Sequence, residues 1–138
     1  MVDTDNGALG CLSYDEDTSR FEAAAFAPSA TINACRSIQK FVALDACHTK
    51  SKYPMMLMIA VGIDANDNAI PLSWALVPTE NEEWWTWFCE FLKDTFNEFL
   101  QEGYVFMSDR DKGLVGAVCT VFPQGCAAHC CQHIADNI

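Results

Sequence analysis

The sequence predicts a mixed α/β domain: an antiparallel three-stranded meander, a helix, a fourth strand, a short helix and a fifth strand. The meander is predicted by three apolar, strand-length segments within residues 41–77, because their connections are too short for a parallel return. The first helix is predicted by aromatic residues at helical spacing over residues 84–99. Two more apolar segments, 104–108 and 126–133, flank a short helical segment and complete the order.

Composition and charge set the broad class of the protein. The chain has 138 residues, of which 51% are hydrophobic and 20% charged, so one folded domain is expected. No apolar run reaches the roughly 18 residues of a membrane-spanning helix, and the acidic start does not resemble a signal peptide. The chain has eight cysteines, but it also has enough apolar residues to form a core without disulfide bonds. We therefore expect the cysteines to be reduced thiols. We expect an intracellular protein without a signal peptide or transmembrane segment.

Residues 1–36 are predicted to be an acidic, partly disordered lead-in to a domain that spans residues 37–138. Residues 1–20 are acidic and poor in large apolar side chains, which indicates a loosely docked tail. Residues 21–26 have the composition of a helix, and residues 31–40 fit either a short helix or an extended segment.

The strands of the meander are predicted at residues 41–47, 55–63 and 69–77. Pro71 in the third strand indicates an edge position or a bulge. For the helix that follows, Thr79 and Glu82 have the spacing of a capping box, and Gly103 is expected to end it. A helical crossover makes the strand at 104–108 parallel to an earlier strand. The segment 110–118 is predicted to be the short helix.

Two of the predicted strands end on an aspartate. Asp45 follows the apolar run 41–44, and Asp109 follows the run 104–108. A carboxylate in such a place needs a hydrogen-bond network, a basic partner or a metal ion. Asp45 alone is explained most simply as a structural residue, but the similar arrangement at Asp109 favours a role in chemistry for both. Asp111 is an alternative to Asp109.

Several segments, in this order along the chain, resemble the transposase domain of Mutator-like DNA elements (MULE). They are residues 41–51 (FVALDACHTKS), 62–67 (GIDAND), 74–78 (WALVP), 80–88 (ENEEWWTWF), 108–114 (SDRDKGL) and 128–133 (AHCCQH). The resemblance implies a ribonuclease-H-like fold with the first and fourth strands as neighbours. It also implies cut-and-paste DNA transposition in the nucleus.

In that family, two aspartates and a glutamate bind two divalent ions, Mg²⁺ or Mn²⁺, which serve phosphoryl transfer. By resemblance, Asp45 and Asp109 are the first and second acids of this catalytic metal site. The third acid belongs to a helix beyond the fifth strand, and nothing after His133 supplies it. Glu80, like its neighbours Glu82 and Glu83, is best explained as a helix-start residue. We therefore expect a C-terminally truncated domain that is inactive alone.

The remaining polar residues suggest weaker sites. Cys130 and His133 match the family's Cys-x-x-His motif; zinc is disfavoured because a second, separate ligand pair is lacking. Five residues near the two aspartates are possible DNA contacts: His48, Lys50, Lys52, Arg110 and Lys112. The net charge of −11 has the wrong sign for gripping a phosphate backbone, so DNA binding by this chain is expected to be weak or absent.

Two further functions stay open at this point. One is a domesticated, non-catalytic regulator derived from a transposase, and the retention of both aspartates counts against it. The other is an acidic protein-interaction module, which only the charge supports. A sheet without the family's later helices would also leave an apolar face uncovered, which predicts self-association.

Overall fold

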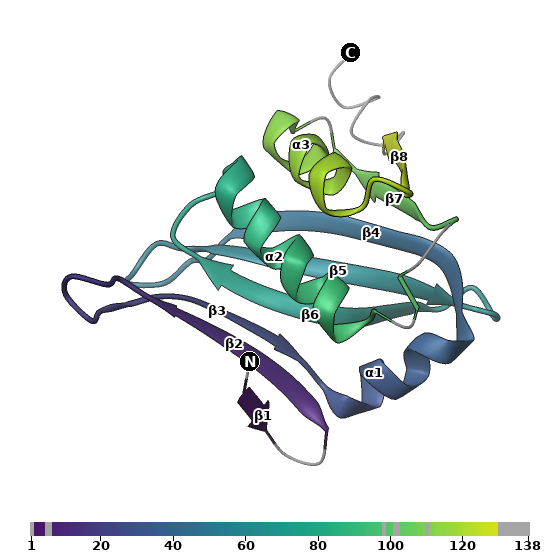
Figure 1. The fold of residues 1–138 in the computed structure, drawn as a ribbon, viewed down its shortest axis with the longest axis horizontal. Coiled ribbons are helices and arrows are strands. Elements are labelled where there is room, and N and C mark those ends of the chain that lie inside the picture. Colours follow the sequence, from purple (N-terminus) through teal and green to yellow (C-terminus); the bar gives the residue numbers. More distant parts are fainter. Residues whose placement is uncertain (1, 5–6, 98, 101–102, 110, 130–138) are drawn as a thin grey trace.

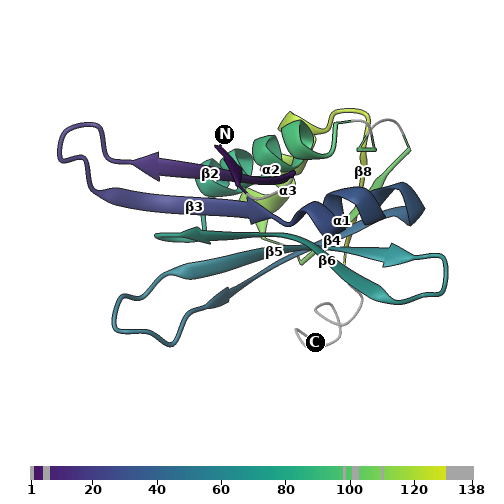
Figure 2. The same cartoon turned by 90° about the horizontal axis from the view of Figure 1, so that it is seen from below.

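The computed structural model describes residues 2–4, 7–97, 99–100, 103–109 and 111–129. In chain order, its elements are β1 (Val2–Thr4), β2 (Ala8–Tyr14), β3 (Phe21–Ala27), α1 (Ser29–Ala34), a 3-10 turn (Cys35–Ser37), β4 (Ile38–His48), β5 (Met56–Asp64), β6 (Ala69–Val77), α2 (Glu82–Thr95), β7 (Val105–Ser108), α3 (Lys112–Val121) and β8 (Cys126–His129). The strands form one mixed sheet in the order β1-β2-β3-β6-β5-β4-β7-β8. Helices α2 and α3 lie on the same face of it (Figures 1 and 2).

The predicted meander is confirmed. Strands β4, β5 and β6 pair antiparallel in succession, close to the predicted boundaries. Pro71 lies next to a register shift in the β5–β6 ladder, where Ala60 pairs with Ser73 and Val61 pairs with Pro71. Strand β3 pairs with Trp74, Ala75 and Leu76 of β6 and not with Pro71, so the missing N–H of Pro71 is tolerated at a bulge in a part of β6 that β3 does not pair.

The parallel fourth strand is confirmed as well. Strand β7 pairs parallel with β4, and β8 pairs parallel with β7. The helical segments α2 and α3 make the two crossovers that parallel pairing requires. The predicted fifth strand, 126–133, is described only as far as His129.

The prediction of a loosely docked tail and a helix at residues 21–26 is wrong. Residues 8–14 and 21–27 form the antiparallel strands β2 and β3, and β3 pairs with β6. Ala23, Ala25 and Ala27 alternate with more exposed residues and are almost fully buried. Burial with a period of two residues under α2 decides the conformation here, against the helical preference of alanine. The predicted domain division at residue 36 stays a prediction.

The ends of α2 also differ from the prediction. Asn81, and not Thr79, caps the helix, because its side chain accepts the N–H of Trp84 at 2.9 Å. The helix ends at Thr95, earlier than expected, and Gly103 instead adopts a positive φ of 85° just before β7.

The core lies between the sheet and the two helices. The aromatic face of α2 fills it, as predicted: Trp85 and Phe88 are completely buried, as is Phe96 just beyond the helix. Helix α3 packs closely on the start of α2. A Cβ on Gly113 would lie 2.8 Å from the backbone nitrogen of Glu82, so only glycine allows this approach.

Two further observations concern the described residues. None of their helices is long and apolar enough to cross a membrane. Five of their cysteines are unpaired: Cys11, Cys35, Cys47, Cys89 and Cys119.

Candidate functional site

The site forms at the edge of the sheet where three strands end in the same direction. Strand β5 is antiparallel to both β4 and β6, and β7 is parallel to β4, so β4, β6 and β7 share one direction. Their carboxyl ends therefore meet at one edge. Asp45 lies near the end of β4, Glu80 follows β6, and Asp109 follows β7 directly.

Asp45 and Asp109 occupy matching positions on neighbouring parallel strands. The β4–β7 ladder pairs Phe41 with Val105 and Ala43 with Met107. Continued by two residues, this register would place Asp109, the residue directly after β7, opposite Asp45. Asp45 is exposed and Asp109 is half-buried. Two acids that are 64 positions apart in the sequence thus lie at one place on the sheet.

Short-range hydrogen bonds orient both carboxylates. The N–H of Ala46 donates to Asp45 Oδ1 at 2.9 Å. The N–H of Asp111 donates to Asp109 Oδ1 at 3.0 Å. Asp111 itself caps α3, because its Oδ1 accepts the N–H of Leu114 at 3.0 Å. This capping role explains Asp111 and favours Asp109 as the acid of the candidate site.

Glu80 is a third acid at this edge, which the sequence analysis assigned to the start of the helix. It lies just before α2, and its Oε1 accepts the indole N–H of Trp85 at 3.1 Å. Burial raises the pKa of Glu80, and the negative charges of Asp111, Asp109 and Asp45 raise it further, against the opposing effect of the Trp85 hydrogen bond. The common direction of β4, β6 and β7 puts Glu80 at the same end of the sheet as Asp45 and Asp109. Recognising this direction in the sequence would have identified Glu80 as a third acid there.

The carboxylate groups at this end of the sheet are of a kind that binds a hard divalent cation. Carboxylate oxygens are the ligands that Mg²⁺ prefers. Yet no group of three or more His, Cys, Asp or Glu side chains among the described residues is arranged to hold a metal. Asp45 and Asp109 are two exposed or half-buried carboxylates at this place that could act as ligands of such a cation.

Three of the predicted DNA-contacting residues follow Asp45 closely in the sequence, and their side chains are exposed. His48 ends β4 and, together with Glu80, lines a pocket of about 440 Å³. Lys50 and Lys52 lie in the turn between β4 and β5, where the ammonium group of Lys52 lies 5.5 Å from the ring centroid of Tyr53.

Lys112 is the exposed first residue of α3. The other predicted residues, Arg110, Cys130 and His133, lie outside the described residues.

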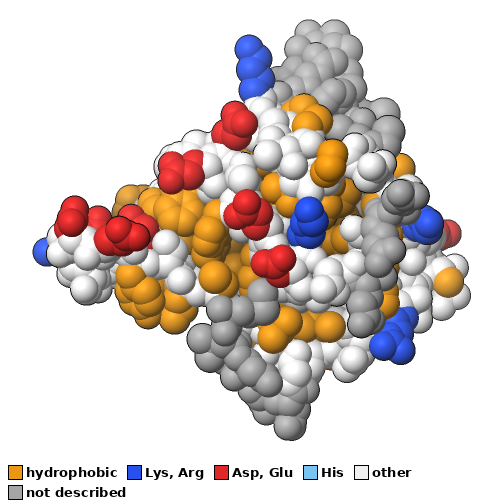
Figure 3. Space-filling view, viewed as in Figure 1, with side chains coloured by type: hydrophobic (Ala, Val, Ile, Leu, Met, Phe, Trp, Pro, Cys, Tyr) orange, Lys and Arg blue, Asp and Glu red, His pale blue; other side chains and the backbone are white. Residues whose placement is uncertain are grey.

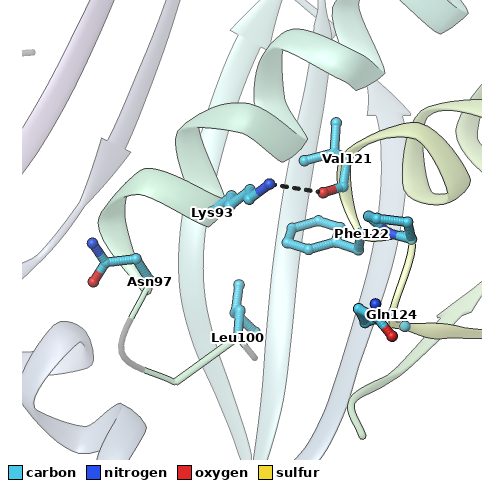
Figure 4. Close-up of a pocket in the computed structure, with 8 residues that line it drawn as sticks. Lys93, Asn97, Leu100, Val121, Phe122 and Gln124 are labelled. Carbon is cyan, nitrogen blue, oxygen red and sulfur yellow. Dashed lines mark hydrogen bonds between the residues drawn. The ribbon is translucent and has the colours of Figure 1, made fainter. Parts of the chain in front are cut away.

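A separate pocket of about 290 Å³ lies between the last turns of α2 and α3 (Figure 4). Its walls include Leu100, Val121 and Phe122, and Lys93 Nζ donates to the carbonyl oxygen of Val121 at 3.3 Å. The lysine connects the two helices, and among the described residues no acid lines the pocket. Its residues offer no nucleophile or carboxylate pair, so the candidate chemistry stays at the sheet edge.

Comparison with known families agrees with this arrangement. The model of the MULE transposase domain matches residues 41–137, which is well over half of the chain. The chain therefore belongs to the MULE transposase domain family.

The chain is also similar to the transposase for insertion sequence element IS1201 from Lactobacillus helveticus, with 31% identity over 80 residues. The match covers 58% of this chain and 21% of that transposase, so the chain spans only a small part of its curated relative.

Proposed function

We propose that this chain is part of a cut-and-paste DNA transposase, in which Asp45 and Asp109 are two acids of a divalent-metal site. The observation that carries the proposal is the parallel pairing of β4 with β7, which, continued by two residues, places Asp109 opposite Asp45. Membership of the MULE transposase domain family supplies the reaction class. The retention of both aspartates favours this reading over a non-catalytic regulator.

The arrangement of strands supports a ribonuclease-H-like fold for the part of the chain that matches the family. Strands β6-β5-β4-β7-β8 are consecutive in the sheet, with an antiparallel meander on one side of β4 and parallel strands on the other. This is the neighbour relation between the first and fourth strands that the resemblance implies. The strands β3, β2 and β1 continue the sheet laterally, on the side of β6 that faces away from β5.

The residues of the chain would hold the cation through Asp45 and Asp109, whose backbone hydrogen bonds orient the carboxylates. A bound Mg²⁺ or Mn²⁺ would supply activation of the attacking oxygen and stabilisation of the leaving oxygen at a phosphate. Phosphoryl transfer needs a complete and closely positioned ligand shell. We therefore expect the chain alone to bind the ion weakly and to leave DNA intact.

Nuclear DNA is the proposed partner of the whole transposase, with the basic residues His48, Lys50 and Lys52 beside the site as contacts. The net charge of −11 opposes binding of DNA by this chain alone. A bound divalent ion would reduce the local repulsion between the acids and a phosphate.

Thermal unfolding with and without Mg²⁺ or Mn²⁺ tests the metal proposal. At a concentration about tenfold above the Kd, a ligand that binds only the folded state adds roughly 1.4 kcal/mol of stability. We expect either ion to raise the melting temperature of the wild type, and Asp45→Asn and Asp109→Asn to abolish the increase. Asp17→Asn is the control, because Asp17 is exposed and lies before β3. Equal increases in all four proteins, or none in the wild type, would refute the site.

A further inference from the structure

A groove follows the exposed side of α2 where this helix faces β2. Two hollows form it: one of about 580 Å³ beside the first turns of α2, and one of about 180 Å³ further along the helix. Both are lined by Trp87 and Glu90, so they adjoin. Ser13 and Cys11 of β2 lie on the opposite side of the first and the second hollow. We call the two hollows together the α2 groove.

Tryptophan rings form the apolar part of the α2 groove. Trp84 and Trp87 meet edge to face, with ring centroids 5.5 Å apart at an angle of 83°. Both pack against the core on one side and remain partly exposed on the other. The outward face of a surface helix normally carries polar residues. Figure 3 shows hydrophobic side chains between the acidic tip of the β2–β3 hairpin and the acidic side chains over α2.

The charged residues that line the α2 groove are all acids. They are Glu22 of β3 and, from α2, Glu82, Glu83, Glu90 and Asp94. Among the described residues, no lysine or arginine lines either hollow. Lys93, the one basic residue of α2, instead donates to the carbonyl oxygen of Val121 on the side of α3 (Figure 4). The groove therefore combines aromatic rings with uncompensated negative charge.

We propose that the α2 groove binds a peptide segment of a partner protein that carries several lysine or arginine residues. The long side chains of these residues can lay their methylene groups on the tryptophan rings and bring their charged ends to the carboxylates. The same carboxylates repel a phosphate backbone, which argues against nucleic acid as the occupant. This inference does not depend on the proposed metal site.

The sequence of the chain indicates that the occupant belongs to another protein. The chain has eight basic residues, and no two of them are adjacent in the sequence. A segment of this chain would therefore bring few cations to the groove, whereas a basic segment of a partner would match its charge along the whole length.

The length of the α2 groove indicates the size of the occupant. From Trp84 to Asp94 the helix rises about 15 Å, which an extended peptide covers with about five residues. Two adjoining hollows along one line therefore suit a short extended segment better than a single small amine. Exposed ion pairs are individually weak, so we expect a Kd on the order of 100 μM at low ionic strength.

Fluorescence polarisation with a labelled, end-blocked pentalysine tests the proposal on the full chain. We expect saturable binding by the wild type, and none of the same peptide with acetylated lysines, which keeps its length and loses its charge. Binding should also change the tryptophan emission, because two of the four tryptophans line the groove.

Two double variants with identical substitutions distinguish the groove from the overall charge. Glu90→Gln combined with Asp94→Asn removes two charges from the groove and should raise the Kd at least about fivefold. Glu16→Gln combined with Asp67→Asn is the matched control, because it removes two exposed charges outside the groove. It should change the Kd by less than about twofold.

All four substituted residues are exposed, and circular dichroism melting shows whether each variant folds. Glu90→Gln alone decides if the groove variant does not. A wild type that does not bind pentalysine, or binds it without a change in tryptophan emission, would overturn the proposal. Equal increases of the Kd in the two double variants would also overturn it, because the net charge and not the groove would then attract the peptide. So would binding of the acetylated peptide with the same Kd.

Discussion

Acidic and amide side chains that lie within a few positions of each other have different physical roles in this molecule. Asp109 and Asp111 are separated by one residue, yet Asp111 caps α3, whereas Asp109 accepts the backbone N–H of Asp111 just after β7. Glu80 and Asn81 are adjacent, yet Asn81 caps α2 and Glu80 turns inward to Trp85. The hydrogen-bond partner of each oxygen therefore separates the structural acids from those available for chemistry.

Replacing Asp111 tests the assignment of this residue to the helix cap. Loss of the hydrogen bond to the N–H of Leu114 in Asp111→Ala should lower the free energy of unfolding by about 1 kcal/mol. Asp111→Asn removes the same charge and keeps a capping oxygen, so it should lose much less. Urea unfolding of the three proteins measures the difference. Equal losses in both variants would mean that the charge matters and the cap does not.

Glu80 should make stability depend on pH in a defined direction. Its pKa is raised from the ordinary value of 4.5, chiefly by burial, so the folded state binds the proton more tightly than the unfolded state. Stability is therefore lost as the pH rises from 4.5 through the raised pKa. The side chain at position 80 of the Glu80→Gln variant cannot ionise. The variant should therefore have a higher free energy of unfolding than the wild type at neutral pH, and about the same free energy of unfolding below pH 4.5.

Urea unfolding at several pH values measures that effect. Glu83→Gln is the control, because it removes an exposed charge from the first turn of α2 and loses a favourable interaction with the helix dipole. A stability gain for Glu80→Gln that persisted at low pH would contradict the account.

The sequence predicted the two aspartates because each ends an apolar run, which is a local pattern. It did not predict the place of Glu80, because that depends on the direction of three strands and on the indole of Trp85. No local pattern distinguishes Glu80 from Glu82 or Glu83. The sequence pattern predicted that β7 runs parallel to one of the earlier strands. The family resemblance added that this strand is β4.

At the scale of elements, two glycines of α3 lie at its junction with α2. A Cβ on Gly113 would lie 2.8 Å from the backbone nitrogen of Glu82, which cannot move without the helix. A Cβ on Gly116 would lie 2.8 Å from Glu82 Oε1, the end of an exposed and flexible side chain. The two positions look alike in the sequence and differ in what they contact.

Alanine at these two positions should therefore have opposite effects. Gly113→Ala should destabilise the protein by about 1–3 kcal/mol, because α2 and α3 must separate to admit the methyl group. Gly116→Ala should be neutral or stabilising, because the carboxylate of Glu82 can move and alanine gains up to about 1 kcal/mol of helix propensity. Thermal melting of both variants compares them. Similar losses would show that the helix contact is as tight at Gly116 as at Gly113.

The elements that the sequence predicted well are those with a strong and regular apolar pattern, such as β5, β6 and the body of α2. Strand β3 was missed because its buried residues are alanines, which are also typical of helices. Their burial follows from the pairing of β3 with β6, a contact between residues about 50 positions apart. The cap of α2 was misplaced by two residues, because Thr79 and Asn81 are both capping residues and only the backbone path chooses between them.

At the scale of the whole molecule, the sheet joins the N-terminal strands to the family domain. Strand β3 pairs with β6 through Ala24, Ala25 and Phe26, and its small residues complete the surface on which α2 packs. A chain in which residues 1–36 were an independent tail would not share its core with that helix. The structure instead predicts that the N-terminal strands and the domain unfold together, as one cooperative unit.

A buried charge in β3 tests that unity. Ala25 is 3% exposed, so Ala25→Asp would bury an unpaired carboxylate and should lower the free energy of unfolding by roughly 3 kcal/mol or more. All four tryptophans lie in residues 74–87, outside the N-terminal strands, and Trp74 pairs with Phe26 of β3, so their fluorescence reports the domain together with its contact to β3. We expect the urea midpoint of tryptophan fluorescence to fall in Ala25→Asp and to coincide with that of circular dichroism. Ala24→Asp, one residue away on the half-exposed side, should cost about 1 kcal/mol at most. An unchanged fluorescence midpoint in Ala25→Asp would show that the first 36 residues are a separate unit after all.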